Sequence, residues 1–412
     1  MDAITLFQTD ILPVIASENF NSNNYKVLKC DSEFKEKGDD HFTSNTYFIN
    51  LVIQFEETAP ETHAIILKLP PDNVDLQNFI GTDAQFYNEV TIYAETIPAF
   101  LEFIRKKCEL SYNEYDLFPK CYFSKWENMK GAVVLQDMRS VGFRVCEDRI
   151  ILDYDHCAVV LKALGRFHAI SYAMKKLNSS LFHQLTNKFK ETLHTEEIFY
   201  KITLSRVVEY FERKKEIDED TFQRFKDHIK EPLKLFMDLI KPKAPLAVLC
   251  HGDFCRNNVL FKYEDGKPCA VKFFDFQMVR YASPVIDISF MCFLNTTSEF
   301  RRKHWDEMLF VYHRSLVESL ADILGCAVAD VEQEYTLEMI RNEFRNYAFF
   351  GFMICHFFLP EMVSSPAERL VHFGDVYKSV EDSAIGCAKI GGDSATALVA
   401  DMVKDMDLMG IF

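Results

Sequence analysis

Several well-known catalytic signatures are missing from this sequence. It has no G-x-x-x-x-G-K-[ST] motif, no zinc-spaced cluster of cysteine and histidine, and no G-x-S-x-G element. These absences argue against P-loop kinases and ATPases, zinc-binding modules and hydrolases built on a nucleophile elbow. The chain also has no internal repeat and no low-complexity linker. Its function therefore has to come from residues that the fold brings together.

Clustered basic charge is also lacking. The chain has 46 lysines and arginines against 62 acidic residues, a net charge of −16, and no basic run. Proteins hold nucleic-acid backbones with clustered lysine and arginine, so no nucleic-acid partner is expected. The charge does not argue against ATP, because Mg²⁺ and a few local cations can neutralise its phosphates.

Targeting and membrane signals are weak. Met1 to Asn19 contains no lysine or arginine, so it lacks the basic start of a signal peptide. The most apolar later run, Tyr347 to Leu359, is shorter than the ~20 residues that a membrane span requires. The 12 cysteines are scattered without a C-x-x-C pair and are interpreted as reduced core residues. We expect a soluble cytoplasmic protein with no membrane partner, and no obligate protein partner is evident.

The strongest chemical signal lies between Val248 and Phe276. Two β-prone runs, residues 259–263 and 271–276, are separated by a turn that contains Asp265 and Gly266. An Asp-Gly pair between such runs predicts a β-hairpin. Because a hairpin brings its open ends together, residues just before the first strand and at the end of the second should lie side by side.

Three oxygen-bearing side chains meet at the open end of this predicted hairpin: Asp253, Asn258 and Asp275. Phosphoryl transfer from ATP needs hard oxygen ligands for Mg²⁺ and a carboxylate for the proton of the attacking hydroxyl. The spacing matches the kinase pattern of a catalytic-loop Asp and Asn followed by a metal-binding Asp. His-Gly-Asp alone could be a turn in which Asp253 caps a helix, but the ordered set favours a phosphotransferase.

The N-terminal part predicts a small lobe rich in strands. Residues 25–30, 46–55 and 63–69 are rich in β-branched or aromatic side chains, and Lys68 is a single charge in the third run. Residues 83–97 have helical periodicity, with Glu89 beside the apolar face. Kinases pair a strand lysine with a helix glutamate to fix the lysine on the phosphates. We favour Lys68–Glu89, with Glu95 as the alternative partner.

Two further segments bear on nucleotide binding. Residues 37–45 lie where a kinase folds its phosphate-covering loop, but they contain one glycine, and an ordinary hairpin connection fits equally well. We therefore assign no phosphate contact to Ser44 or Asn45. Residues 122–123 and 131–135 predict two more strands, after which residues 133–138 would form the hinge or, alternatively, a plain strand and loop.

Helical periodicity dominates after Tyr154. Helical segments are predicted at 158–169, 195–215, 220–241 and through most of 305–403. Strands early and helices late favour an α+β protein with two lobes, as the length of 412 residues also does. His168 is interpreted as a buried core histidine rather than a catalyst or metal ligand. The aromatic runs 347–352 and 356–358 could line a steroid pocket, but core packing is favoured.

These residues resemble the ecdysteroid kinase-like family of insects, also called CHK-like, which is related to choline kinases and aminoglycoside phosphotransferases. The resemblance is carried by residues 251–263, by Phe274-Asp275-Phe276-Gln277 and by residues 283–287. Asp-Phe-Gln stands where protein kinases have Asp-Phe-Gly. Further matches lie at residues 67–70, 86–89, 135–138, 142–143, 148–149 and 167–171.

The resemblance implies a protein-kinase-like fold with a β-rich N-lobe carrying one main helix, residues 1–138, and a mainly helical C-lobe, residues 139–412, joined by a hinge at about 134–142. It also implies that ATP and Mg²⁺ are the cofactors. The implied roles are Asp253 as catalytic base, Asn258 and Asp275 as magnesium ligands, Lys68, Glu89, Gln136 and Met138 at ATP, and His251 and Asp287 as supports of the catalytic loop. The family usually has Leu-Glu-Asp-Leu near the hinge, where this chain has Gln136 and Met138.

The resemblance implies a small-molecule hydroxyl as the acceptor, most simply an ecdysteroid or a related apolar alcohol. Plant or xenobiotic hydroxyl compounds and choline are the alternatives, followed by an inactive kinase-fold binding protein. A protein kinase is disfavoured because no Ala-Pro-Glu follows Asp275, and only about a dozen residues separate Asp275 from Asp287.

Overall fold

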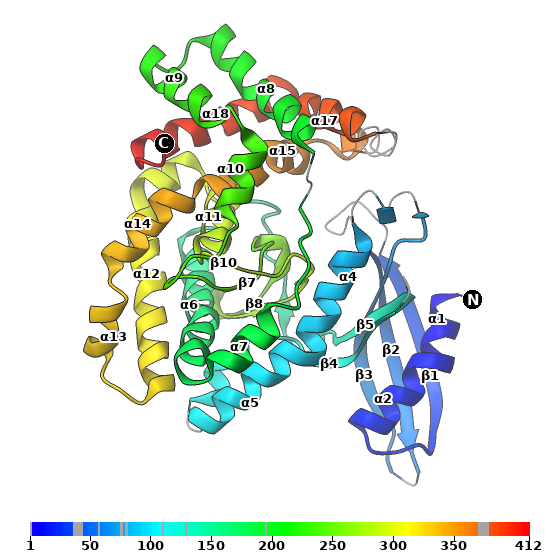
Figure 1. The fold of residues 1–412 in the computed structure, drawn as a ribbon. Coiled ribbons are helices and arrows are strands. Elements are labelled where there is room, and N and C mark those ends of the chain that lie inside the picture. Colours follow the sequence, from blue (N-terminus) through cyan, green and yellow to red (C-terminus); the bar gives the residue numbers. More distant parts are fainter. Residues whose placement is uncertain are drawn as a thin grey trace.

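A five-stranded sheet and a larger helical body form the two lobes of the protein (Figure 1). The structure is a computed structural model and describes residues 2–35, 44–56, 58–74, 77–78, 81–108, 111–127, 130–193, 196–369 and 379–412. Among these residues no helix is both long and apolar enough to span a bilayer. All twelve cysteines are free thiols. The predicted α+β fold with a small sheet lobe and a helical lobe is confirmed.

The small lobe is built on an antiparallel sheet with the strand order β1-β2-β3-β5-β4. Its strands are β1 (Tyr25–Lys35), β2 (Asn45–Phe55), β3 (Glu61–Leu69), β4 (Cys121–Glu127) and β5 (Lys130–Gln136). The five predicted strands are therefore confirmed. Lys68 near the end of β3 pairs with Thr46 on one side and Val133 on the other, which places it in the middle of the sheet.

An N-terminal helical segment covers one face of this sheet. It consists of α1 (Ala3–Leu6), a π-helical turn (Phe7–Ile11) and α2 (Leu12–Asn19). Phe7, Leu12 and Ile15 are fully buried in the same apolar cluster as sheet residues such as Ile49 and Ile53. The side chain of Asn19 donates to the carbonyl of Tyr122 in β4. No helix was predicted over these residues.

The helix predicted at residues 83–97 is longer than expected. It begins as α4 (Thr82–Thr91), passes through a π-helical turn (Ile92–Thr96) and continues as α5 (Ile97–Lys107). Phe100 and Ile104 of α5 are buried in the core of the larger lobe. The helix that carries Glu89 is thus anchored in both lobes.

The larger lobe is mainly helical. A short turn (Tyr112–Tyr115) precedes β4, and a second (Met138–Val141) follows β5. The helices are α6 (Tyr154–Leu177), α7 (Ser179–Thr186), α8 (Glu197–Lys214), α9 (Glu219–His228), α10 (Pro232–Leu239), α11 (Val285–Asn295), α12 (Ser298–Leu324), α13 (Val328–Glu334), α14 (Leu337–Tyr347), α15 (Phe349–Val363), α17 (Val380–Lys389) and α18 (Gly392–Leu408). The predicted segment 220–241 is divided into α9 and α10, because Pro232 cannot donate to a preceding carbonyl and begins a new helix.

Helix α15 lies inside this lobe, and its aromatic residues belong to the core. Phe349, Phe350 and Phe352 of this helix are buried, as is Tyr347 at the end of α14. In the second aromatic run His356 is buried, and Phe357 and Phe358 are partly buried against the core, so the core interpretation is confirmed. Gly351 lets α15 approach α11 closely, since a Cβ there would lie 2.4 Å from the carbonyl oxygen of Ser289.

The predicted catalytic hairpin is also present. β8 (Val259–Glu264) pairs with β9 (Lys267–Phe273), and the two-residue strand β6 (Phe143–Arg144) joins them. The second strand ends earlier than residue 276, because Asp275 has φ +66°, outside the β region. Before the hairpin, β7 (Val248–Cys250) pairs with β10 (Arg280–Ala282), and a short turn (Arg256–Asn258) leads into β8.

Candidate active site

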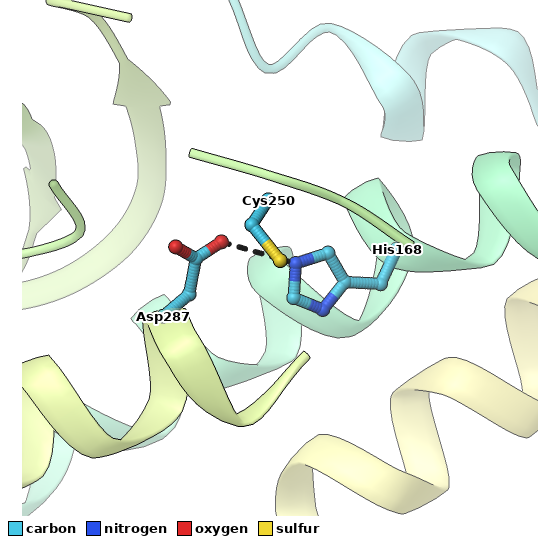
Figure 2. Close-up of side chains that lie close together, drawn as sticks. All are labelled: His168, Cys250 and Asp287. Atoms are coloured by element: carbon cyan, nitrogen blue, oxygen red, sulfur yellow. Dashed lines mark hydrogen bonds and ion pairs between the residues drawn. The ribbon is translucent and has the colours of Figure 1, made fainter. Parts of the chain in front are cut away.

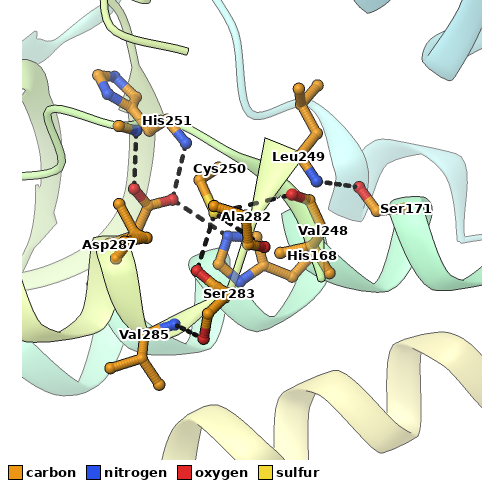
Figure 3. Close-up of polar contacts among 12 residues, drawn as sticks. His168, Ser171, Val248, Leu249, Cys250, His251, Ala282, Ser283, Val285 and Asp287 are labelled. Carbon is orange, nitrogen blue, oxygen red and sulfur yellow. Dashed lines mark hydrogen bonds and ion pairs between the residues drawn. The ribbon is translucent and has the colours of Figure 1, made fainter. Parts of the chain in front are cut away.

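The loop between β7 and β8 is held in one conformation by Asp287 at the start of α11. The two carboxylate oxygens of Asp287 accept from the backbone N–H groups of His251, at 2.7 Å, and Gly252, at 2.8 Å (Figure 3). Gly252 has φ +84°, and a Cβ there would lie 1.9 Å from the carbonyl oxygen of Met278. Only glycine fits this position. The His251 ring bonds to the carbonyl of Phe274, 2.9 Å away, and so ties this loop to the segment of Asp275.

A buried group of His168, Cys250 and Asp287 lies beneath this loop (Figure 2). Side chains of these types can bind metal, but each has protein partners here. His168 bonds to the Tyr312 hydroxyl at 2.9 Å and to Asp287 at 3.2 Å, and the Cys250 thiol donates to the carbonyl of Ser283. Burial raises the pKa of the Cys250 thiol well above its usual value. The group therefore acts as packing for Asp287, and the interpretation of His168 as a core histidine is confirmed.

Asp253 and Asn258 contact each other across the loop between β7 and β8. The Asn258 amide donates to the carboxylate of Asp253, at 2.9 Å, and to its carbonyl, at 2.8 Å. Burial, together with the nearby negative charge of Asp275, raises the pKa of Asp253 to about 7. A carboxyl group with this pKa can gain or lose a proton near neutral pH, which suits a general base.

The Asp275 carboxylate lies at the boundary of the lobes and contacts Lys68. Its Oδ1 lies 2.7 Å from Lys68 Nζ, which also lies 2.6 Å from Glu89 Oε2. All three side chains are largely buried. Burial acts to lower the pKa of Lys68, but the two carboxylates outweigh it and the pKa is raised. Lys68 is therefore a permanent cation. Glu95, the alternative partner, forms an ion pair with Lys188 instead.

A cavity of about 330 Å³ opens between the lobes beside this cluster. Lys68, Glu89 and Asp275 lie in its wall, together with apolar side chains such as Ile66 from the sheet and Leu260 from β8. Pockets of this size that combine apolar walls with a few polar groups are typical of small-molecule sites.

Two of the residues predicted to contact ATP line cavities. Gln136 lies in the wall of the cavity that contains Lys68 and also in the wall of a larger cavity, which residues of α5 line as well. Met138 is buried and lines the larger cavity. Three residues not singled out in the sequence lie in the wall of the first cavity: Phe48, Arg139 and Arg144. The Arg139 guanidinium stacks on the Phe48 ring at 3.9 Å and pairs with Asp137. A cation following the hinge strand is the only signal in the sequence that could have identified Arg139.

Of residues 37–45, predicted as the phosphate-covering loop or a hairpin connection, residues 37–43 lie outside the described residues. Ser44 and Asn45 are described and buried, and the Asn45 amide donates to Asp72 at 2.9 Å.

Comparisons with known proteins place the chain in a family. A sequence model of the ecdysteroid kinase-like family matches residues 38–325. No curated protein matches. Among solved structures, an aminoglycoside phosphotransferase in complex with GDP and kanamycin is 12% identical, with 92% of this chain and 96% of that chain covered and a TM-score of 0.37. An aminoglycoside phosphotransferase from Streptomyces rimosus in complex with ADP and streptomycin is 17% identical, with 69% of this chain and 90% of that chain covered and a TM-score of 0.26.

A glucosamine kinase is 10% identical, with 90% of this chain and 99% of that chain covered and a TM-score of 0.24. TM-scores this low support no argument about the site. The assignment of the site rests on the family match and on the geometry described above. The family match covers well over half of the chain and includes Lys68, Glu89, Asp253, Asn258, Asp275 and Asp287. The chain belongs to the ecdysteroid kinase-like family and is a small-molecule phosphotransferase.

Proposed function

We propose that this enzyme transfers the γ-phosphoryl group of ATP, with Mg²⁺, to a hydroxyl of an ecdysteroid or a related apolar alcohol. The observation that carries the proposal is the position of Lys68. One ammonium group joins Glu89 in the small lobe to Asp275 beside the catalytic loop, at 2.6 and 2.7 Å. A lysine so held is a fixed positive charge at the mouth of a cavity that suits a nucleotide.

The proposed roles follow from the chemistry of each group. Lys68 would bind the phosphates, with Glu89 fixing its direction. Asp253 would accept the proton of the acceptor hydroxyl, and its raised pKa supports this role. His251 and Asp287 would hold the loop that carries Asp253. The adenine would lie near Gln136, where Ile66 and Leu260 supply apolar walls. Backbone groups near Met138 would bind the adenine.

The residues present fit a magnesium ion. Asn258 and Asp275 offer amide and carboxylate oxygens, the ligands that Mg²⁺ prefers. The Asn258 amide nitrogen is committed to Asp253, which leaves the amide oxygen for the cation. When bound, Mg²⁺ would neutralise the phosphate charge that develops during transfer.

We further propose that residues 1–138 form the nucleotide-binding lobe, that residues 134–142 form the hinge and that residues 139–412 carry the catalytic loop and the acceptor site. The free thiols support a reducing compartment, such as the cytoplasm.

The proposal is tested by incubating the protein with Mg-ATP and separate pools of ecdysteroids, choline, and plant or xenobiotic alcohols, and by detecting added phosphate with mass spectrometry. We expect an ecdysteroid or related alcohol to be phosphorylated. Phosphorylation of choline alone, or of a plant or xenobiotic alcohol alone, would contradict the ecdysteroid proposal and assign the acceptor to that class instead. Binding of ATP without any phosphorylated product would favour an inactive binding protein.

Asp253→Asn is the companion variant. Removing the base should lower kcat by about 100-fold or more while ATP binding stays nearly unchanged. The matched control is Asp148→Asn, which removes a carboxylate that bonds to the backbone of Ile150 and Ile151 outside the cavity. Full turnover in Asp253→Asn would exclude Asp253 as the base.

A further inference from the structure

A second cavity, separate from the one that contains Lys68, lies where α12, α14 and the end of α18 meet. Its volume is about 400 Å³. In Figure 1 the end of α18, marked C, lies close to α12 and α14. We call this second cavity the arginine cavity, because four arginines line it: Arg301, Arg302, Arg341 and Arg345.

The arginine cavity is locally positive on an acidic protein. Its four guanidinium groups share three carboxylates, those of Asp306, Glu338 and Asp405, which leaves one positive charge in excess. The whole chain has a net charge of −16. A positive site in such a field favours an anion over the many cations that the rest of the surface attracts.

Two of these arginines have N–H donors that no described residue accepts. Among the described residues, Arg302 uses its Nε for Asp405, and Arg345 uses one terminal nitrogen for Glu338 and Asn342. A guanidinium has five N–H donors. Their side chains are about half exposed, 48% for Arg302 and 45% for Arg345, so a ligand can reach the remaining donors. Such donors match carboxylate and phosphate groups.

The other arginines are committed to the protein. Arg301 is buried and bonds to both Asp405 and the carbonyl of Thr296. Arg341 forms a bidentate pair with Asp306. These fixed groups form the frame of the cavity, and the two half-exposed arginines supply its open donors.

Apart from these arginines and the carboxylates of Asp306 and Asp405, the residues that line the cavity are apolar or aromatic. Leu309, Phe344, Leu408 and Met409 lie in its wall, as does the ring of Trp305. The indole N–H of Trp305 is buried and has no hydrogen-bond partner in the part of the chain that the structure describes. Burying a donor without a partner lowers the stability of a protein. An acceptor atom reaching this N–H would remove that loss of stability.

We propose that the arginine cavity binds a small organic anion with an apolar body and a carboxylate or phosphate head. The apolar wall would contact the body, and Arg302 and Arg345 would bind the head. A carboxylic acid and a phosphorylated alcohol share this chemistry, and the second class includes products of the enzyme's proposed reaction. Binding at this site does not depend on the proposed acceptor, because it needs neither ATP nor turnover.

The test is titration calorimetry on the full chain with octanoate and octyl phosphate in separate experiments. Octanol lacks the head and inorganic phosphate lacks the body, so both should bind at least tenfold more weakly. Tighter binding of octyl phosphate would identify the phosphate source, and tighter binding of octanoate the carboxylate source. Octanol binding as tightly as the anions, or no binding of either anion at millimolar concentration, would overturn the proposal.

Matched variants locate the ligand. Arg302→Gln and Arg345→Gln should each weaken binding about tenfold. The control is Arg314→Gln, because Arg314 is also on α12, is also 48% exposed and also bonds a carboxylate through Nε, yet lies outside the cavity. An equal loss in the control would contradict the site. Arg302 also pairs with buried Asp405. If Arg302→Gln does not fold for that reason, the result for Arg345→Gln decides the test.

The two tryptophans give an independent readout. Trp126 lies in β4 of the small lobe, so Trp126→Phe leaves Trp305 as the sole indole emitter. Octyl phosphate should then change the emission of this variant with the affinity found by calorimetry. Emission that stays constant at saturation would contradict a ligand beside Trp305.

Discussion

Asp287 shows how much one side chain contributes to the catalytic loop. Its two oxygens accept from two successive backbone N–H groups, and the group is fully buried. Asp287→Asn replaces one acceptor by a donor that faces an N–H, so we expect a loss of about 3 kcal/mol in the free energy of unfolding and a fall in kcat. Denaturant unfolding and turnover measure these effects.

The control for this variant is Asp306→Asn, whose carboxylate is 70% exposed and pairs with Arg341 at the surface. It should cost less than about 1 kcal/mol. If Asp287→Asn is no more destabilising than this control, Asp287 does not support the loop.

The buried side chain of His356 should make the free energy of unfolding depend on pH. Burial lowers its pKa to about 3, and its Nε2 bonds to the Thr203 hydroxyl. Between this pKa and the ordinary value of about 6.5, only the unfolded chain binds the proton. Stability supplied by neutral His356 is therefore present above pH 6.5 and is lost as the pH falls, by about 1.4 kcal/mol per pH unit.

The measurement compares denaturant unfolding of the wild type and His356→Gln at pH 7 and pH 5. The variant should lose less stability than the wild type over this interval. Thr203→Val removes the partner but keeps the histidine, so it should keep the wild-type slope. Equal slopes in the wild type and His356→Gln would show that His356 does not titrate in this way.

Among the elements, α2 makes the clearest prediction. Leu12 is fully buried between this helix and the sheet. Leu12→Ala leaves a cavity there, and we expect a loss of about 2–5 kcal/mol. Gln8→Ala changes an exposed position of the same segment and should be nearly neutral. Thermal or denaturant unfolding distinguishes the two, and equal effects would mean that the helix does not pack as described.

The sequence predicted elements best where local signals agree with tertiary structure. The Asp265-Gly266 turn and its flanking β-prone runs define the β8–β9 hairpin, and the match is close. The helix α2 was missed because its apolar residues continue through Pro13, which reads locally as a break but is tolerated in the first turn.

Side-chain direction was harder to predict than element type. Gln136 and Met138 are two residues apart and would share one face of a strand. The strand ends at Gln136, however, and a 3₁₀ turn begins at Met138, and only Gln136 of the two lines the cavity that contains Lys68 as well as the larger cavity. The walls of a cavity come from segments far apart in sequence, so Phe48 and Arg139 could be identified only in the folded chain.

At the scale of the whole molecule, Lys68 and Asp275 join the lobes. A ligand in the cavity between them contacts both lobes, so nucleotide binding should stabilise the entire chain. At a nucleotide concentration of 100 times Kd, the expected gain is about 2.7 kcal/mol, which thermal unfolding would record as a rise in Tm. If Mg²⁺ is required, EDTA should reduce this rise.

Lys68→Met tests whether this stabilisation depends on the proposed site. The variant leaves Glu89 and Asp275 buried without their cation, so its own Tm should fall and Mg-ATP should raise it by much less than in the wild type. The matched control is Lys188→Met, which breaks a lysine–glutamate pair with Glu95 at a more exposed position outside the cavity. The control should keep the full nucleotide-induced rise. Because both variants remove one lysine from the chain, a difference between them reports on the site and not on net charge, and an unchanged rise in Lys68→Met would place the nucleotide elsewhere.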